Sequence, residues 1–276
     1  MIVNPLNVYR EPVEKAIADN ICHFGPPSPL RDAIEYALKN GGKRFRPAIV
    51  YLVSEALGFN ADVTEAALAI EYFHTASLIA DDLPCMDDDD ERRNVPALHK
   101  AFNESTAVLA TYALIAAGYD KIRKAAELMG SAEMGMLAIE NASLNTGILG
   151  AAGGQYADLN PQLEDGHFVL DVIDKKTGTL FEISFVFGWL FGGGNPSFLG
   201  EVKQAARSFG RAFQISDDFL DLEQDGAGMN YPAVVGADKA KLLLHQELHN
   251  YYSALKTLQI ETPELLALGK MVEARL

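Results

Sequence analysis

The sequence predicts an all-α protein, and three observations support that prediction. Signals for β-strands are nearly absent, whereas Ala, Leu, Glu and Lys recur at spacings of three and four residues, as on one face of a helix. Glycine and proline pairs separate these periodic stretches. The 276 residues, 49% of them hydrophobic, can bury one large core, and no stretch resembles a linker. We therefore expect a single domain spanning residues 1–276.

The first half of the chain contains five of the expected helices. Pro26-Pro27 and Gly41-Gly42 separate the first three, and Pro84 follows the fourth. The fourth helix is apolar around much of its girth, so we expect it to line the interior of a bundle. In chain order, these helices are expected at 9–22, 29–39, 45–57, 62–82 and 103–128.

The second half adds five helices, which gives about ten around a central cavity. Glycine-rich stretches at 150–154 and 226–228, and the run 192–196, supply the breaks. The strongly apolar helix that ends just before the run 192–196 carries four large aromatic residues. We expect them to pack in the core: Phe181, Phe185, Phe187 and Trp189. The five helices are expected at 131–149, 164–189, 197–223, 231–255 and 262–274.

Two acidic clusters close two of these helices. A single acidic run is usually solvated surface, but two clusters facing one cavity would form a cage for several metal ions. In the second cluster, spacings of three, four and seven from Gln214 place its carboxylates on one helical stripe, where they repel one another unless a cation neutralises them. Oxygen ligands without Cys or His suit Mg²⁺, which is also bound by substrate phosphates. The candidate ligands are Asp81, Asp82, Asp87, Asp217, Asp218 and Asp221.

Three basic stretches could bind the phosphate groups of such a substrate. They are GGKRFRP at 41–47, Arg92-Arg93 directly after the first acidic cluster, and Lys175-Lys176-Thr177. Each stretch alone could be ordinary surface. Together they combine the fork of arginine with the mobile charge of lysine, which is a combination that suits a diphosphate.

These motifs, in this order, resemble those of the short-chain trans-prenyl diphosphate synthases. The resemblance covers about residues 28–236 and includes GGKRFRP, DDLPCMDDDDERR, KKTGTLFE, FQISDDFLD and NYPAVVG. It implies an isoprenoid synthase-like fold in a polyprenyl synthase-like domain. His74 precedes the first acidic cluster on an apolar helix, where a histidine is ordinarily a core residue; the resemblance makes it a diphosphate ligand.

The resemblance also implies which residues hold which group. Isopentenyl diphosphate would be bound by Lys43, Arg46, His74 and Arg93. The allylic diphosphate, which could be dimethylallyl, geranyl or farnesyl diphosphate, would be bound with Mg²⁺ by the catalytic residues Arg92, Lys176, Thr177 and Gln214. Gln155 is expected to give structural support near the site.

Product length is expected to depend on Phe73, Ala76 and Ser77, which precede the first acidic cluster on helix 62–82. Farnesyl-producing relatives usually carry an aromatic residue at position 76. Alanine at this position leaves the bottom of the product cavity open, so geranylgeranyl diphosphate is the expected product. Farnesyl diphosphate synthesis, a class I cyclase and a weakly active or regulatory subunit are the alternatives.

Composition excludes several other functions. A net charge of −15 argues against nucleic acid and anionic membrane surfaces as partners. Two cysteines without a CxxC motif favour a reducing setting, and the N-terminus resembles neither a signal nor a transit peptide. The longest apolar runs are shorter than the ~20 residues of a spanning helix. We therefore expect a cytoplasmic protein without stable membrane insertion, and the resemblance implies a homodimer.

Two segments depart from the family pattern. The segment 225–230 is short, and Gly228 stands where relatives carry a lysine before Tyr-Pro. Thr111-Tyr112 stands where relatives often carry Gly-Asp, so one polar group at the cavity mouth is expected to be absent.

Overall fold

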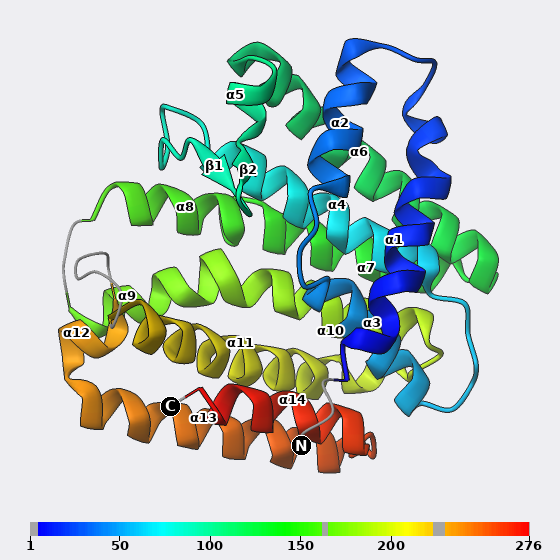
Figure 1. Cartoon of the computed structure of the whole chain (residues 1–276). Coiled ribbons are helices and arrows are strands. Elements are labelled where there is room, and N and C mark those ends of the chain that lie inside the picture. Colours follow the sequence, from blue (N-terminus) through cyan, green and yellow to red (C-terminus); the bar gives the residue numbers. More distant parts are fainter. Residues whose placement is uncertain (1–4, 162–164, 223–229, 276) are drawn as a thin grey trace.

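The computed structural model describes residues 5–161, 165–222 and 230–275, and it confirms the all-α prediction (Figure 1). Among these residues the only strands are β1 (Glu91–Arg92) and β2 (Val95–Pro96), an antiparallel pair with Glu91 opposite Pro96. The α-helices are α1 (Asn7–Asn20), α2 (Pro29–Lys39), α3 (Phe45–Ala56), α4 (Thr64–Asp81), α5 (Leu98–Ala101), α6 (Glu104–Met129), α7 (Ala132–Thr146), α8 (Ala151–Leu159), α9 (Gly166–Val172), α10 (Thr179–Phe191), α11 (Leu199–Leu222), α12 (Tyr231–Val235), α13 (Ala237–Thr257) and α14 (Pro263–Glu273).

Three short helical turns complete the described chain. Two are 3₁₀ turns, at Ile21–Phe24 and Pro196–Phe198. The third is a π-helical turn, η2, at Ile173–Gly178, which joins α9 to α10. A π-turn admits one extra residue per turn, so it shifts the faces of the two flanking helices relative to each other. Turns of this kind are frequent at functional sites.

The expected helix boundaries are wrong in three places. The stretch 150–154 was expected to be a break, but α8 begins within it and includes Gly153 and Gly154. The expected helix 164–189 is interrupted by η2, and the expected helix 231–255 is divided at Gly236, whose φ of 90° ends α12. The shortened segment at 225–230 lies outside the described residues, apart from Asn230.

Helix α10 forms the centre of the largest core. Every residue from Thr179 to Phe191 is buried except Glu182, and the helix packs against α3, α4, α7 and α11. The expected core aromatics Phe181, Phe185 and Phe187 are fully buried, and Trp189 is 4% exposed, which confirms the prediction. Ring contacts link this helix to Phe209 on α11 and to Tyr251 on α13.

The helices that carry the acidic clusters end on the same side of the molecule. Helices α4 and α11 both end at the left in Figure 1, where α8 and α12 also lie. α6 packs along α4, while α13 and α14 cover the lower side of α11 (Figure 1). Eleven of the 18 residues of α4 are buried, in agreement with its expected place inside the bundle. No helix in the described ranges is long and apolar enough to cross a membrane.

Candidate active site

The loop after α4 turns back and brings two acidic residues together. The backbone N–H of Asp87 donates to the carbonyl of Asp81 at 2.9 Å, and the N–H groups of Met86 and Asp88 both donate to Leu83. These bonds close a compact turn. The carboxylates of Asp81 and Asp87, six positions apart in sequence, therefore lie at one point at the end of the helix.

The pKa of Asp81 is raised to about 6, mainly by burial and further by the like charge of Asp87. Lys176 and Arg92 act in the opposite direction but do not cancel the effect. Burial therefore makes the ionised form of this carboxylate costly. A bound dication would relieve that cost, so the Asp81–Asp87 pair fits an oxygen-ligated metal such as Mg²⁺.

Lys176 lies on η2, close to this acidic pair. Its Nζ lies 2.6 Å from Asp158 and 4.0 Å from Asp87, and Gln155 Nε2 donates to Asp87 Oδ1 at 3.1 Å. Burial opposes the charge of Lys176, but the bond to Asp158 and the nearby carboxylates outweigh it and raise its pKa. Lys176 is therefore held as a cation beside the acidic turn.

Glycine allows this approach of α8 to η2. A Cβ atom at Gly154 would lie 2.5 Å from the backbone nitrogen of Lys176, so no larger residue fits without movement. The contact brings Gln155 and Asp158 of α8 to Asp87 and Lys176. Glycine lowers the stability of the helix locally, but it permits this close tertiary contact.

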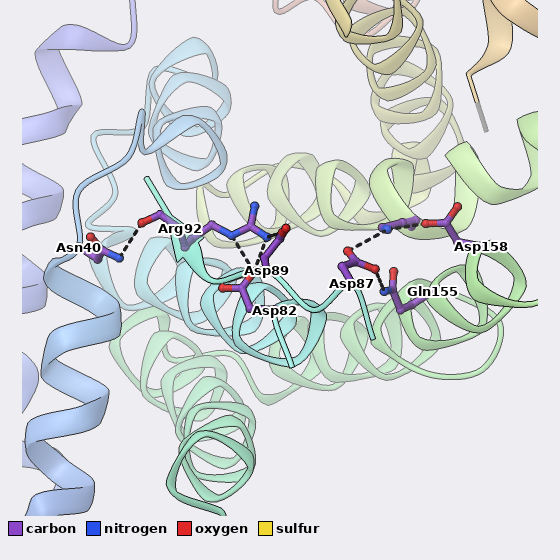
Figure 2. Close-up of polar contacts among 8 residues, drawn as sticks. Asn40, Asp82, Asp87, Asp89, Arg92, Gln155 and Asp158 are labelled. Atoms are coloured by element: carbon purple, nitrogen blue, oxygen red, sulfur yellow. Dashed lines mark hydrogen bonds and ion pairs between the residues drawn. The ribbon is translucent and has the colours of Figure 1, made fainter. Parts of the chain in front are cut away.

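Asp82 pairs with Arg92 on the β1–β2 hairpin (Figure 2). Arg92 Nε donates to Asp82 Oδ1 at 2.8 Å, its Nη2 contacts both Asp82 and Asp89, and its backbone carbonyl accepts from Asn40 Nδ2 at 3.2 Å. Asp82 is 3% exposed. Its carboxylate serves to hold the β1–β2 turn and Arg92 against α4.

The carboxylates of the second acidic cluster also diverge. Asp217 is partly buried, which raises its pKa, and it forms an ion pair with Arg275, which opposes that rise. Asp218 is buried and accepts from Gln214 Nε2 and from the backbone N–H of Tyr231, both at 2.9 Å, so both its oxygens are used within the protein. Asp221 is exposed. Asp217 therefore offers the most available buried carboxylate of this cluster.

Thr177 and Gln214 are joined across η2 and α11. Thr177 Oγ1 donates to Gln214 Oε1 at 2.8 Å. Arg211, one turn before Gln214, binds both oxygens of Asp174 at 2.7 Å and also binds Glu247 at 2.8 Å. This half-buried fork fixes η2 against α11 and so sets the position of Lys176 and Thr177.

Four of the predicted diphosphate ligands line one basic pocket of about 470 Å³. Lys43, Arg46, His74 and Arg93 come from the 41–46 loop, α3, α4 and the turn between β1 and β2. The pocket contains five basic residues and one acidic residue, in a chain with 23 basic and 38 acidic residues overall. Its lining is Arg10, Gly42, Lys43, Arg44, Phe45, Arg46, Glu71, His74, Arg93, Asn94 and Phe213.

Electrostatics in this pocket favour an anionic ligand. Burial, together with the charge of Arg93 and against the opposing charge of Glu71, lowers the pKa of Arg46 to about 10. Burial and the neighbouring arginines keep the pKa of His74 well below 6.5, so its ring is neutral, and its Nε2 lies 3.3 Å from Arg46 Nη1. Unpaired cations crowded together are unfavourable unless an anion joins them.

Buried ion pairs hold the loop that carries these cations. Arg44 has a left-handed φ of 48°, and its guanidinium binds Glu71 on α4, Glu14 on α1 and the carbonyl of Leu38. Both Arg44 and Glu71 are at most 3% exposed. Truncating Arg44 would leave the buried carboxylate of Glu71 unpaired.

A second pocket, apolar and about 410 Å³ in volume, runs along the opposite face of α4. Asp81 lies at one end, Ala76 and Ser77 line its middle, and Phe73 is the α4 residue farthest from Asp81. The Phe73 ring packs on Tyr119 with centroids 5.2 Å apart and on Gly118, where a Cβ atom would lie 2.6 Å from it.

Helices α6, α8 and α10 close the other walls of this pocket. Thr111 of α6 lines the wall, and its hydroxyl donates to the carbonyl of Ala107 at 3.0 Å. Tyr112 is 65% exposed and points away. The remaining lining is Ala80, Met86, Ile115, Thr146, Ala151, Ala152, Gln155, Tyr156, Leu159 and Leu180.

Most of the predicted residues thus fall into three groups. Asp81, at one end of the apolar pocket, lies beside Asp87 and Lys176. The four residues predicted to bind isopentenyl diphosphate line the basic pocket, and Asp82 and Asp218 hold their surroundings. In the described part of the chain, no three acidic, His or Cys side chains already form a metal cage.

Three polar residues near these sites were missed from the sequence. Asp158 binds Lys176, Arg275 binds Asp217, and Arg10 lines the basic pocket. Asp158 could have been found, because it follows Gln155 by three residues and so shares a helix face with it. Arg10 and Arg275 carry no local sequence signal.

Comparison with known proteins agrees with this geometry. A family model described as polyprenyl synthetase matches residues 27–244. Geranylgeranyl pyrophosphate synthase 4 of Arabidopsis thaliana is 36% identical over 250 residues, which cover 84% of this chain and 66% of that protein. The chain belongs to the polyprenyl synthetase family.

Two further relatives are matched over a larger share of their own length. A farnesyl diphosphate synthase of Micrococcus luteus is 35% identical over 84% of each chain. The structure of an FPP/GFPP synthase from Zymomonas mobilis matches with a TM-score of 0.85 and 31% identity, over 98% of this chain and 99% of that one. The protein is therefore a prenyltransferase.

Proposed function

We propose that the protein condenses isopentenyl diphosphate with an allylic diphosphate to give a linear trans-prenyl diphosphate. One observation carries this proposal: an apolar pocket with carboxylates and Lys176 at its mouth adjoins, across α4, a separate basic pocket. The first suits a long hydrocarbon with a diphosphate head, and the second suits another diphosphate. A cyclase has no use for a second diphosphate pocket.

Mg²⁺ would be held by Asp81, Asp87 and Asp217. When bound, it would draw negative charge from the leaving diphosphate. The buried Asp81 with its raised pKa and the adjacent Asp87 support this assignment. Asp82 and Asp218 would act by holding Arg92 and the start of α12, and the exposed Asp221 would contribute from the periphery.

The chain's own residues would bind and orient both substrates. Lys176, Arg92, Thr177 and Gln214 would surround the allylic diphosphate, while Lys43, Arg46, Arg93 and the neutral ring of His74 would hold isopentenyl diphosphate. The allylic carbon–oxygen bond breaks and its electrons leave with the diphosphate. The double bond of isopentenyl diphosphate supplies the electron pair of the new carbon–carbon bond. The departing diphosphate takes up the proton that is lost.

Geranylgeranyl diphosphate is the proposed product. Alanine and serine at positions 76 and 77 leave the pocket open down to Phe73, which supports a floor one turn below the position that closes the pocket in farnesyl-producing relatives. Farnesyl diphosphate is the alternative, since α6 and α8 also line the pocket and could limit the chain first.

We further propose that the protein is a cytoplasmic homodimer. Several large apolar side chains on α6 to α8 and the turn between α7 and α8 are exposed, and a second copy would cover them: Leu109, Tyr112, Met136, Leu144, Ile148, Leu149 and Tyr156. Exposed apolar side chains gathered on one region often mark an interface with another protein. Cys22 and Cys85 are free and exposed, as suits a reducing compartment.

The proposal is tested by incubating the purified protein with Mg²⁺, labelled isopentenyl diphosphate and dimethylallyl, geranyl or farnesyl diphosphate. Chromatographic sizing of the dephosphorylated products should give a 20-carbon alcohol. A 15-carbon product would select the farnesyl alternative. Cyclic hydrocarbons, or no condensation with any starter, would refute the proposed reaction.

A further inference from the structure

Arg10 on α1 lines the basic pocket, although it belongs to none of the motifs that carry the site. We propose that Arg10 is a further binding residue for the diphosphate of isopentenyl diphosphate. This inference rests on the proposed function of the pocket. It adds to that pocket a cation from a helix outside the sequence motifs.

Contacts on both sides of Arg10 fix the helix that carries it. The hydroxyl of Tyr9 donates to Glu55 at 2.5 Å, and its ring stacks on Tyr51 with centroids 5.4 Å apart. One turn later, Glu14 accepts from Arg44 Nε at 2.7 Å. Positions 10 and 14 share one helix face, so the bond at Glu14 directs Arg10 toward the 41–46 loop.

No described carboxylate compensates the charge of Arg10 in this arrangement. Within the described part of the chain, no carboxylate lies within ion-pair distance of Arg10, whereas Arg44 beside it is bound by both Glu14 and Glu71. Lys43, Arg46 and Arg93 likewise form no ion pair there. A fifth cation among these groups adds repulsion in the free protein and attraction when a diphosphate is present.

The exposure of Arg10 indicates how it would act. Arg10 is exposed at the rim of the basic pocket, whereas Arg46 and Arg93 are partly buried. The guanidinium of Arg10 can therefore move onto a bound ligand from the solvent side. The planar fork of arginine binds phosphate oxygens in pairs. Because an exposed charge is screened by water, we expect about a five- to tenfold contribution to binding, less than a buried charge-assisted bond would give.

The test compares Arg10→Ala with Arg10→Lys and with a matched control, Lys15→Ala. Lys15 is an exposed cation on the same helix that does not line the pocket. Binding of isopentenyl diphosphate to the metal-free protein is measured by calorimetry at two salt concentrations, and KM is measured separately for each substrate. Thermal melting confirms that each variant is folded.

We expect Arg10→Ala to raise Kd and KM for isopentenyl diphosphate about five- to tenfold, to leave KM for the allylic substrate unchanged, and to weaken the salt dependence. Arg10→Lys should recover part of the loss, and Lys15→Ala should match the wild type. Equal Kd values for Arg10→Ala and the wild type would overturn the inference, as would the same loss in Lys15→Ala. If the wild type itself fails to bind isopentenyl diphosphate, the proposed function fails instead.

Discussion

Replacing Ala76 by tyrosine tests whether α4 sets the length of the product. Ala76 is 2% exposed and lines the apolar pocket one turn nearer the carboxylates than Phe73. A ring at position 76 would move the floor up by three residues. At ~1.5 Å of rise per residue, this shortens the pocket by about 4.5 Å, which is close to one isoprene unit.

The shortened pocket would exclude the last five carbon atoms of a 20-carbon chain. Burial of each carbon contributes about 0.8 kcal/mol, so about 4 kcal/mol that favours the longer chain is lost. Because each ~1.4 kcal/mol is a factor of ten, the preference changes by roughly a thousandfold. Ala76→Tyr should therefore release farnesyl diphosphate in place of the 20-carbon product.

The assay sizes the products made from labelled isopentenyl diphosphate and dimethylallyl or geranyl diphosphate. Ala76→Ser keeps a small side chain at the same position and serves as the control. Phe73→Ala, the opposite change, should lengthen the product, but removing this buried ring also costs about 3–5 kcal/mol of stability, so its melting is measured first. A folded Ala76→Tyr variant that still makes the wild-type products would refute the ruler mechanism.

Two further predictions concern the carboxylates. Asp81→Asn should lower turnover by about 10²–10³-fold or more. The pKa of Asp81 is about 6 in the folded protein against an ordinary 3.8, so the folded state favours the protonated carboxyl. The resulting contribution to folding stability is fully present below pH 3.8 and is lost as the pH rises through 6. The metal-free Asn variant should therefore be more stable than the wild type at pH 7, by about 1–3 kcal/mol in chemical denaturation, and this gain should vanish near pH 4; an equal gain at both pH values would contradict the assignment. Arg275→Ala should tighten Mn²⁺ or Mg²⁺ binding to the substrate-free protein about fivefold in calorimetry, since the ion pair with Asp217 no longer competes. Unchanged affinity would mean that Arg275 and the metal do not share Asp217.

The sequence predicted those parts of the fold that depend on local periodicity. The apolar residues around most of the circumference of α4 and the aromatic residues of α10 identified two buried helices. Apolar side chains on every face of a helix leave no face for water. The glycines at 153 and 154 led to a wrong prediction, since local propensity disfavours a helix there. The close approach of Lys176 accounts for glycine at 154, and that of the Ile148 carbonyl accounts for glycine at 153. The π-turn η2 is set by Arg211 and Asp174, which lie far apart in sequence.

The sequence indicated which residues line the two pockets, but not which side chains pair with one another. The motifs brought the right residue types to the two pockets. Which carboxylate faces the cavity depends on the path of the loop: Asp81 and Asp82 are neighbours, yet one lines the apolar pocket and the other holds Arg92. Arg10 and Arg275 reach the site from near the two ends of the chain, so only the fold reveals them.

Under the proposed ruler mechanism, the packing of the Phe73 ring on Gly118 would make product length depend on two positions. Any side chain at 118 would collide with the ring, while a smaller residue at 73 would leave the glycine surface without a partner. A lineage or a directed-evolution experiment that deepens this pocket would therefore have to pass through a less stable intermediate or change both helices together. Libraries that vary 73 and 118 jointly should reach long-chain enzymes that single-site libraries miss.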